Sequence, residues 1–506
     1  MKENMQQTEF DAGDTFTLFC HDLPTKPRED VGTVLVSGAS GYIGGRLVPE
    51  LIARGYKVRV MVRAETTVMK KRFPKAEVVV GDALDRKSLE RALKGVHTAY
   101  YLIHSLLLGP RGFEDADIEA ARNFRQAAEK NGVERMLYLG GLGDCRTSQS
   151  RHLQCRMEVA DELAAGSVPV TILRAAVIIG SGSASYEIIR HLAGRLPFLL
   201  IPPWARNRCQ PIGVRDVIKY LVGCLEVPET SGRSFDIGGR DILTYELMLE
   251  TFADVIGKKV AFFHVPSLDI RIFAYAASLL TPVPAPITLC LMEGLKDEVV
   301  ARDDEITKLI PFEPLSYREA IARALTREEQ DKVHTRWSDA YPPAHELAIK
   351  LYEMEGKPLY TARYDLESDK GPERLFSSIS RIGGRQGWFN SNWMWWLRGM
   401  VDRVFFGVGS TRGRRSQTEL EVNDVIDFWR VEEIRENERL LLRAEMKLPG
   451  KAWLEFGISE DGSSTTMTIR PWFYTKTVFG KAYWYAFLPF HQYIFQDLLK
   501  QIEKRA

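Results

Sequence analysis

The stretch Gly38-Ala-Ser-Gly41-Tyr-Ile-Gly44 directly follows the β-branched run Val34-Leu-Val36 and opens a segment with helical apolar spacing. Glycines at these places permit a tight turn and let a pyrophosphate approach the backbone closely. The free N–H groups and the dipole at the start of a helix favour the negative charge of such a group. The stretch therefore predicts a dinucleotide site, with a purely structural turn as the alternative. The predicted contact residues are Gly38, Ser40, Gly41, Tyr42, Ile43 and Gly44.

The segments around this turn repeat the same alternation of strand and helix. Short β-branched runs alternate with amphipathic segments from Thr33 to about Arg174, which is typical of βαβ units around a buried parallel sheet. The pattern continues less regularly as far as Leu325. We interpret residues 31–325 as a Rossmann domain, a doubly wound parallel α/β sheet, with a substrate lobe.

The residue that ends the second strand distinguishes two nicotinamide cofactors. An acid at this position binds the ribose 2′-hydroxyl of NAD, whereas an arginine accommodates the 2′-phosphate of NADP. Arg63 occupies the position, and Glu65 lies two residues further along the chain. The sequence thus predicts NADP(H), with NAD(H) as the alternative and a solvated Arg63 as the simpler explanation.

A second domain follows, because nine of the ten tryptophans lie between Trp337 and Trp484. The sequence order predicts a strand, two helical segments, several strands and a closing amphipathic helix with Phe490, Ile494, Leu498 and Ile502 on one stripe. This α+β order fits an antiparallel sheet that grips a long helix. Trp393, Trp395 and Trp396 are expected in a core or a cavity wall. The predicted boundaries are a flexible tail at 1–30, a linker at 326–344 and the second domain at 345–506.

The composition excludes several classes of partner. Among 506 residues, Lys and Arg total 68 and Asp and Glu total 67, so no global field favours nucleic acid. The six cysteines lack C-x-x-C spacing, and no metal site is predicted. The longest apolar stretches are shorter than the roughly 20 residues of a membrane helix. We expect a cytoplasmic protein without a membrane span, for which association with a membrane surface stays open.

These motifs resemble the short-chain dehydrogenase/reductase superfamily in its extended or atypical branch. The resemblance covers about residues 31–325 and includes Gly81-Asp82, Pro211-Ile-Gly-Val-Arg-Asp216 and Phe235-Asp-Ile-Gly-Gly239. Within the superfamily the chain is similar to the NmrA-type and complex I 39-kDa-subunit-like proteins. That similarity implies NADP(H) binding, often without demonstrable dehydrogenase activity, and a contact of Asp82 with the adenine. From the residues alone, a helix cap explains Asp82 equally well.

Residues 345–506 resemble an uncharacterised bacterial family with a START-like (SRPBCC) helix-grip fold. The resemblance rests on Asp427-Phe-Trp-Arg430, Trp453-Leu-Glu-Phe456 and Leu488-Pro-Phe-His491. Such a fold leaves room along its long helix, so an apolar or lipid-like ligand is expected in this domain.

The expected active site departs from the superfamily pattern. Ordinary members carry a Ser after the fifth strand and then Tyr-x-x-x-Lys, but here Gly140-Gly-Leu-Gly143 and His152-Leu-Gln-Cys-Arg156 stand at these positions. Arg156 keeps the positive charge that contacts the nicotinamide ribose. An imidazole is able to transfer a proton near neutral pH, so His152 is a candidate catalytic residue, with a structural role as the alternative. His104 follows the fourth strand, where such sheets bind ligands, and is a second candidate.

Two functions of different classes are consistent with this sequence. The first is an NADPH-dependent reductase of an apolar carbonyl or quinone-like molecule. The alternative is a binding, regulatory or assembly protein that responds to NADPH without turnover. The missing Ser and Tyr-x-x-x-Lys residues favour the alternative, whereas the intact glycine stretch fits both.

Overall fold

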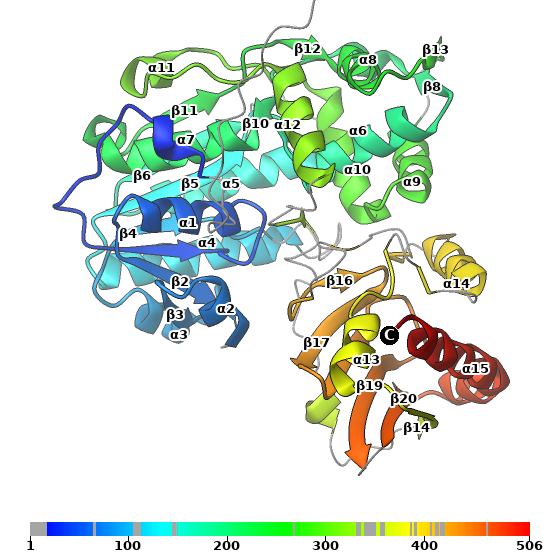
Figure 1. The fold of residues 1–506 in the computed structure, drawn as a ribbon. Helices are drawn as coiled ribbons and strands as arrows, with labels where there is room; N and C mark the ends of the chain where they lie inside the picture. Colours follow the sequence, from blue (N-terminus) through cyan, green and yellow to red (C-terminus); the bar gives the residue numbers. More distant parts are fainter. Residues whose placement is uncertain are drawn as a thin grey trace, which may run out of the picture.

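The computed structural model describes residues 18–63, 67–104, 113–143, 148, 150–266, 269–329, 335–337, 351–354, 360–384, 387–388, 392–404, 407–409, 414, 420–461 and 464–506. Figure 1 shows two modules, one built on a parallel sheet (blue to green) and one built on an antiparallel sheet (yellow to red). No helix in these ranges is long and apolar enough to span a bilayer.

A seven-stranded parallel sheet forms the centre of the first module. Its order is β11-β6-β5-β4-β1-β2-β3, and all neighbouring strands run parallel. The strands are β1 (Thr33–Ser37), β2 (Val58–Val62), β3 (Glu77–Val80), β4 (Val96–Tyr101), β5 (Arg135–Gly141), β6 (Val170–Ala175) and β11 (Ser234–Ile237). The order reverses between β1 and β4, which is where open sheets of this kind bind ligands. The predicted doubly wound Rossmann sheet is confirmed.

Helices cover both faces of this sheet. Val34 of β1 shares a core with Leu47 and Leu221 on one face, while Leu35 shares another core with Phe124 on the other face. Burial on both faces explains the continuous apolar runs of the strands. The helices of this part are α1 (Gly44–Ala53), α2 (Thr67–Arg72), α3 (Arg86–Ala92), α4 (Phe113–Lys130), α5 (Arg151–Ala164) and α7 (Val214–Glu226).

The substrate lobe is formed by shorter elements, at the right of Figure 1. Its helices are α6 (Ala184–Arg195), α8 (Tyr245–Val255), α9 (Ile270–Leu280), α10 (Ala285–Glu293) and α12 (Tyr317–Glu329), whereas α11 (Glu305–Leu309) lies at the left of Figure 1 and packs against β11. Its short strands are β7 (Ile178–Ile179), β8 (Phe198–Ile201), β9 (Arg208–Cys209), β10 (Ile212–Gly213), β12 (Leu243–Thr244) and β13 (Ala261–His264).

The segment before the first strand corrects the predicted tail at 1–30. Phe19 and Cys20 are buried in the same core as α1, and their backbone N–H groups donate hydrogen bonds to the Glu50 carboxylate. Arg54, which follows the last residue of α1, also donates a hydrogen bond to Glu226 of α7 (2.9 Å). The prediction of a flexible segment is wrong for residues 18–30, because α1 supplies acceptors that fix this backbone. Residues 1–17 lie outside the described ranges.

The second module is an antiparallel sheet packed against α15 (Val478–Arg505). The strand order is β14-β20-β19-β18-β17-β16, and β15 also pairs with β20. The other elements are β14 (Tyr360–Thr361), β15 (Tyr364–Ser368), α13 (Pro372–Ile379), α14 (Asn392–Val404), β16 (Val425–Ile426), β17 (Trp429–Arg435), β18 (Arg439–Ala444), β19 (Lys451–Asp461) and β20 (Ser464–Tyr474). The predicted order of elements is confirmed, whereas the START-like assignment stays a prediction.

The closing helix departs from the predicted stripe at one position. Leu498 and Ile502 are fully buried, and Ile494 packs partly against the same core, but Phe490 is 52% exposed. A four-residue spacing advances by about 40° per step around a helix, so a run of four such residues cannot stay on one narrow face. The first half of α15 therefore presents aromatic side chains to the surface.

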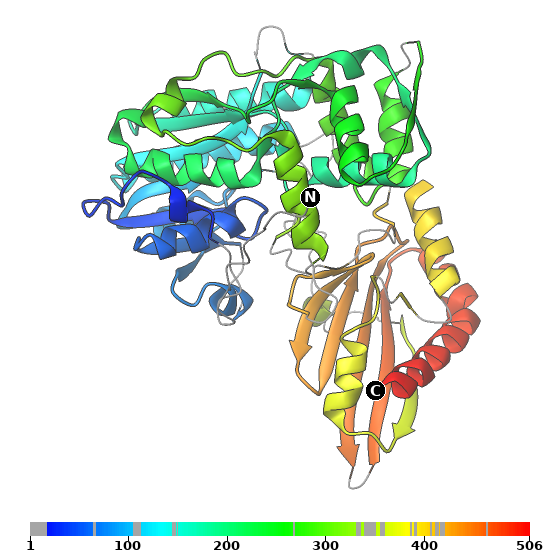
Figure 2. The same ribbon diagram turned by 45° about the horizontal axis from the view of Figure 1, so that its top comes forward.

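Helix α14 connects the modules. The Tyr275 hydroxyl of α9 donates a hydrogen bond to the Val404 carbonyl (3.1 Å), and the Arg403 guanidinium donates to the carbonyls of Ser278 and Thr281. Figures 1 and 2 show α14 between α9 and α15 in both views. The two modules thus share a contact surface at this helix.

Candidate functional site

The glycine turn lies between β1 and α1, at the carboxyl end of β1. Gly38 has a φ of +70°, and a Cβ on it would lie 2.5 Å from the Leu102 carbonyl oxygen. A Cβ on Gly44 would lie 2.3 Å from the Gly38 carbonyl oxygen. Both positions therefore require glycine, and half-buried Ser40 and Gly41 complete the turn. The N–H groups of Gly45 and Leu47 donate to the carbonyls of Gly41 and Ile43, and the turn at the start of α1 fits a dinucleotide pyrophosphate.

Arg46 braces this turn from behind. Its guanidinium lies 4.1 Å from the centre of the Tyr42 ring, and Nη1 donates to the carbonyls of Tyr42 (3.1 Å) and Thr335 (3.0 Å). Trp337 follows on the same segment and lines the adjoining cavity, with its N–H donating to the Gly182 carbonyl (2.8 Å). The predicted linker at 326–344 is therefore wrong for residues 335–337, which belong to the site.

Arg63 and Asp82 lie close together at the ends of β2 and β3. Arg63 is exposed, as the simpler explanation of a solvated arginine expects, and the negative charge of Asp82 acts on its guanidinium. Asp82 accepts a hydrogen bond from the Leu84 N–H (3.0 Å), but the side chain that caps α3 is that of Asp85. Asp82 is therefore not the cap of α3, and the helix-cap alternative for this residue is wrong. Glu65, on which the NAD(H) alternative depends, lies outside the described residues.

His152 and Arg156 lie one helical turn apart on α5, as predicted for the positions of the missing Tyr and Lys. Arg156 is 7% exposed, and its Nη2 donates to the Leu139 carbonyl (2.8 Å). Within the described ranges, His152 Nδ1 and Arg156 Nη1 are buried and have no hydrogen-bond partner. Both residues line the cavity described below. Buried polar atoms without partners at a cavity wall mark a place where a polar ligand group binds.

The second candidate, His104, lies beside His152, with a distance of 5.1 Å between the ring centres. Its Nδ1 lies 3.3 Å from Oδ2 of Asp117, whose side chain is almost fully buried. A carboxylate in this position favours the tautomer with hydrogen on Nδ1. The other ring nitrogen of His104, Nε2, is buried and has no hydrogen-bond partner among the described residues.

Both imidazoles are uncharged at neutral pH. Desolvation lowers the pKa of His104 to about 4, with a smaller lowering by the charge of Arg156, although Asp117 opposes the shift. The pKa of His152 is lowered well below 6.5, mainly by desolvation and also by His104 and Arg156. The expectation of an imidazole that titrates near its ordinary pKa is therefore wrong for both residues, because desolvation and the charge of Arg156 both disfavour the imidazolium form.

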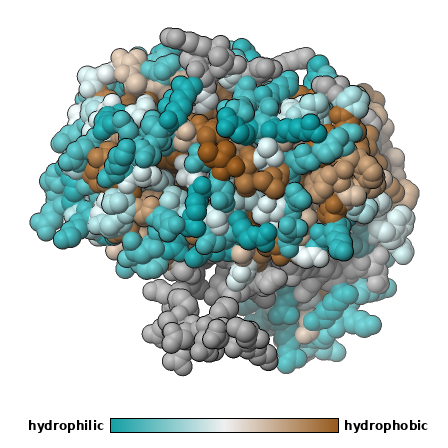
Figure 3. Space-filling view, turned by 90° about the horizontal axis from the view of Figure 1, so that it is seen from above, coloured by the Kyte–Doolittle hydropathy of each residue, from teal (hydrophilic) through white to brown (hydrophobic). Residues whose placement is uncertain are grey.

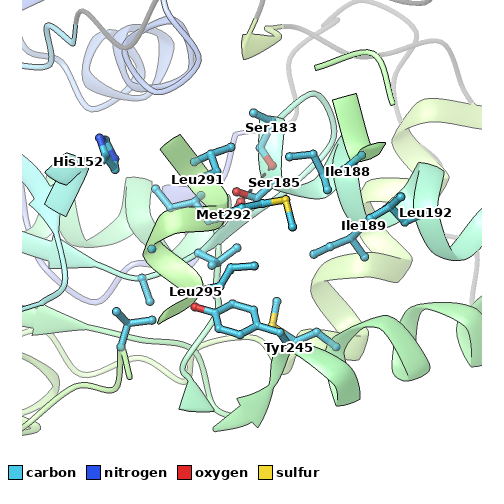
Figure 4. Close-up of a pocket in the computed structure, with 18 of the residues that line it drawn as sticks. His152, Ser183, Ser185, Ile188, Ile189, Leu192, Tyr245, Leu291, Met292 and Leu295 are labelled. Atoms are coloured by element: carbon cyan, nitrogen blue, oxygen red, sulfur yellow. Dashed lines mark hydrogen bonds between the residues drawn. The ribbon is translucent and has the colours of Figure 1, made fainter. Parts of the chain in front are cut away.

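An apolar cavity of about 690 Å³ extends from these residues into the substrate lobe. Figure 4 shows His152 at one end and Ile188, Ile189 and Leu192 of α6 at the other. Its polar wall residues include Tyr42 next to the glycine turn, so the cofactor cradle and the cavity are continuous. The size falls in the range of sites for small-molecule ligands.

The sequence analysis missed Asp117 and most of the cavity wall. Asp117 lies on the buried stripe of α4 with Ala120, Ala121 and Phe124, so an acid within an apolar stripe was the available signal. The cavity residues of α6, β8, α9 and α10 come from segments far apart in the sequence. No local pattern brings such segments together.

Comparison with known families identifies the first module. Residues 30–331, more than half of the chain, match the NmrA-like family. The chain belongs to the NmrA-like family. The predicted resemblance of the first domain is thus confirmed, and together with the glycine cradle it supports a nicotinamide dinucleotide site. Residues 355–498 match a second family, described as a protein of unknown function (DUF2867).

Several known proteins are similar to this NmrA-like chain. A ceramide reductase of Caulobacter vibrioides is 28% identical over 239 residues, which are 46% of this chain and 74% of that protein. Sterol demethylase protein B of Methylococcus capsulatus is 36% identical over 22% of this chain and 35% of its own length, so the match spans about a third of that protein. The Citrobacter sp. triphenylmethane reductase complexed with NADP(H) is 21% identical, with a TM-score of 0.47, over 58% of this chain and 99% of that one.

Proposed function

We propose that this protein is an NADPH-dependent reductase of an apolar, lipid-sized carbonyl or quinone-like molecule. The observation that carries the proposal is the continuity of the glycine cradle, the His104–His152 pair and an apolar cavity of about 690 Å³. The names of two relatives, a ceramide reductase and a sterol demethylase protein, support an apolar substrate.

Each polar residue of the site has a role in this proposal. The glycine turn holds the pyrophosphate, and Arg156 Nη1 donates a hydrogen bond to the nicotinamide ribose. NADPH supplies a hydride for the carbonyl carbon when it is bound. His152 donates a hydrogen bond and then a proton to the substrate oxygen, which becomes a hydroxyl. Asp117 holds His104 against His152, and because Nε2 of His104 carries no hydrogen, the proton that His152 gives up is replaced from water.

We expect that Arg63→Ala lowers the affinity for NADPH by about tenfold or more and leaves NADH affinity unchanged. A charge-assisted hydrogen bond to the 2′-phosphate is worth roughly 1.5 to 3 kcal/mol. Titration of both cofactors measures the effect, and Arg91→Ala, an exposed arginine of α3, is the control. Equal losses for both cofactors, or none, would remove Arg63 from the 2′-phosphate site.

The cavity is tested by a charge placed on its wall. Leu192→Arg is expected to weaken binding of a fluorescent apolar probe at least about tenfold, because an unpaired charge is costly in an apolar site. NADPH affinity should persist, since Leu192 lies at the end away from His152. Leu247→Arg is the control, because Leu247 is exposed on α8 and does not line the cavity. Unchanged probe binding in Leu192→Arg would contradict a ligand in this cavity.

Binding without turnover is the second candidate function. The absence of the Tyr and Lys side chains and the neutral state of both histidines favour it. Single-turnover oxidation of NADPH with a long-chain ketone and a long-chain quinone separates the two functions. Oxidation dependent on the apolar substrate supports the reductase, whereas tight binding of both partners without oxidation supports the binding protein.

We also propose a START-like helix-grip fold for residues 345–506, on the basis of its antiparallel sheet and closing helix. In the described part of this module, the space between sheet and helix holds packed aromatic side chains. These include Trp388, Trp395, Phe428, Trp429 and Phe495. We therefore assign the apolar ligand to the first module and not, as the sequence suggested, to the second.

A further inference from the structure

Helix α14 has the reverse of the usual amphipathic arrangement. Two of its three charged residues, Asp402 and Arg403, are buried and Arg398 is partly exposed, whereas the rest of the outward face is apolar. Asp402 accepts hydrogen bonds from the N–H groups of Lys447 (2.7 Å) and Gly409 (2.9 Å). The exposed side chains of the outward face are Trp393 (63%), Trp396, Leu397, Met400, Val401 and Val404. A helix with its apolar face turned outward marks an interaction surface, because water does not favour it.

The helices on both sides of α14 extend this apolar surface. Tyr275 of α9 contacts Val404, and Trp395 of α14 lies 6.4 Å from Phe495 of α15 between ring centres. Exposed apolar side chains on α9 are Ile272, Leu279 and Leu280. Those on the first half of α15 are Val478, Phe479, Tyr485, Phe487, Phe490 and Tyr493. We call the exposed side chains of α9, α14 and α15 the three-helix surface.

The charges of these segments select the kind of partner. Residues 386–401 and 475–496 contain Arg398, Lys476 and Lys481 but no aspartate or glutamate. Residues 272–292 carry no charged side chain at all. Tryptophan and tyrosine prefer the interface between lipid and water, and sparse basic residues attract anionic head groups. Aromatic side chains with a few basic residues and no acids are therefore more typical of a surface that binds a bilayer than of a protein–protein interface, which has a polar rim.

The cavity opens next to this surface. Leu280 of α9 and Phe198 and Leu200 of β8 line the cavity, and 42%, 51% and 48% of their respective surfaces are exposed. Figure 3 shows apolar atoms gathered at the right-hand side of the molecule, where Figure 1 places β8, α9 and β13. The opening thus lies on the same part of the molecule as α9.

We propose that the three-helix surface docks on the surface of a lipid bilayer and lets an apolar ligand pass between the membrane and the cavity. Docking of this kind places an apolar helix face at the level of the head groups and does not require a spanning helix. Partition from the membrane solves the problem that a lipid-sized ligand is poorly soluble in water. The docking itself does not depend on the reductase chemistry, and it is tested without turnover.

Flotation of the full chain with vesicles tests the proposal. Vesicles of phosphatidylcholine, alone or in an equimolar mixture with phosphatidylglycerol, are expected to carry the protein upward, and more of it with the anionic mixture. The double variant Trp396→Asp/Met400→Asp should bind at least about tenfold more weakly, because binding scales with buried apolar area. The control is Ile242→Asp/Leu247→Asp, which changes two exposed apolar residues outside the surface. Both variants must retain NADPH binding.

A second measurement uses tryptophan fluorescence and substitutions that keep an aromatic side chain at each position. Brominated lipids are expected to quench the fluorescence of the wild-type protein, and Trp393→Phe/Trp396→Phe should lose most of this quenching. Absence of flotation and of quenching would overturn the proposal, as would equal flotation of the aspartate variant. A wild-type dimer that dissociates in Trp396→Asp/Met400→Asp and ignores vesicles would overturn it too, because a second copy would then cover the surface.

Discussion

Replacing His152 with alanine is expected to lower single-turnover hydride transfer to an apolar carbonyl by about 10² to 10⁴, the usual contribution of a general acid. NADPH affinity should persist, because the glycine cradle that we propose for the pyrophosphate lies between β1 and α1 and not on α5. The expected loss is large because His152 replaces the phenol of ordinary relatives and has its Nδ1 unpartnered at the cavity wall.

The pH profile of the wild-type protein distinguishes this buried imidazole from an ordinary one. With the pKa of His104 at about 4 and that of His152 also lowered, both rings are neutral between about pH 6 and pH 8. A neutral imidazole can act as an electrophile toward a carbonyl oxygen. The rate should therefore stay level in this range and rise only as the pH drops toward 4, where imidazolium, the stronger proton donor, accumulates.

The control for His152→Ala is His264→Ala, which removes an exposed imidazole paired with Glu246. This variant should react like the wild-type protein. A step in the rate near pH 6.5 would show a solvated imidazole and contradict the buried site. Undiminished turnover in His152→Ala would assign the proton transfer to another group.

The parts of this structure that could be predicted are those coded by neighbouring residues. The strand, the glycine turn and the helix of the cofactor cradle occupy one continuous segment, so their spacing alone carries the prediction. His152 and Arg156 were found in the same way, because they stand four residues apart on one helix, as the Tyr and Lys of ordinary members do. The order of strands and helices in the second module also follows from local periodicity.

The parts that could not be predicted depend on contacts between distant segments. Asp117 belongs to the site only because α4 places its carboxylate beside the imidazole of His104, which follows β4. Residues 335–337 appear as a linker in the sequence, yet Thr335 bonds to the glycine turn across the fold. The apolar stripe of α14 predicted a core or a cavity wall, since sequence does not show which face of a helix is turned outward. Only Trp395 of its three tryptophans joins the core.

Substitution of Gly44 by alanine is expected to have the largest effect on cofactor binding, a loss of about 10² or more in NADPH affinity. The new Cβ would lie 2.3 Å from the Gly38 carbonyl oxygen and 2.9 Å from the Cα of Ala39, and both neighbours are backbone atoms that cannot rotate away. The turn must therefore shift, and the shift moves the N–H groups that we propose as the pyrophosphate site. Each charge-assisted hydrogen bond lost costs roughly 1.5 to 3 kcal/mol, so the loss of two accounts for the expected factor.

Isothermal titration with NADPH measures the effect of Gly44→Ala, and the melting temperature shows whether the fold persists. Gly194→Ala is the matched control within the same module, because its Cβ would meet only Ile256 Cδ1 at an ordinary 3.8 Å. That glycine lies inside α6, where alanine is the better helix former, so no loss of affinity is expected. The apolar probe should still bind to Gly44→Ala, since the cavity wall beyond His152 does not involve the turn. Full NADPH affinity in Gly44→Ala would show that the pyrophosphate lies elsewhere, and the whole arrangement of cofactor, histidine pair and cavity would then have to be revised.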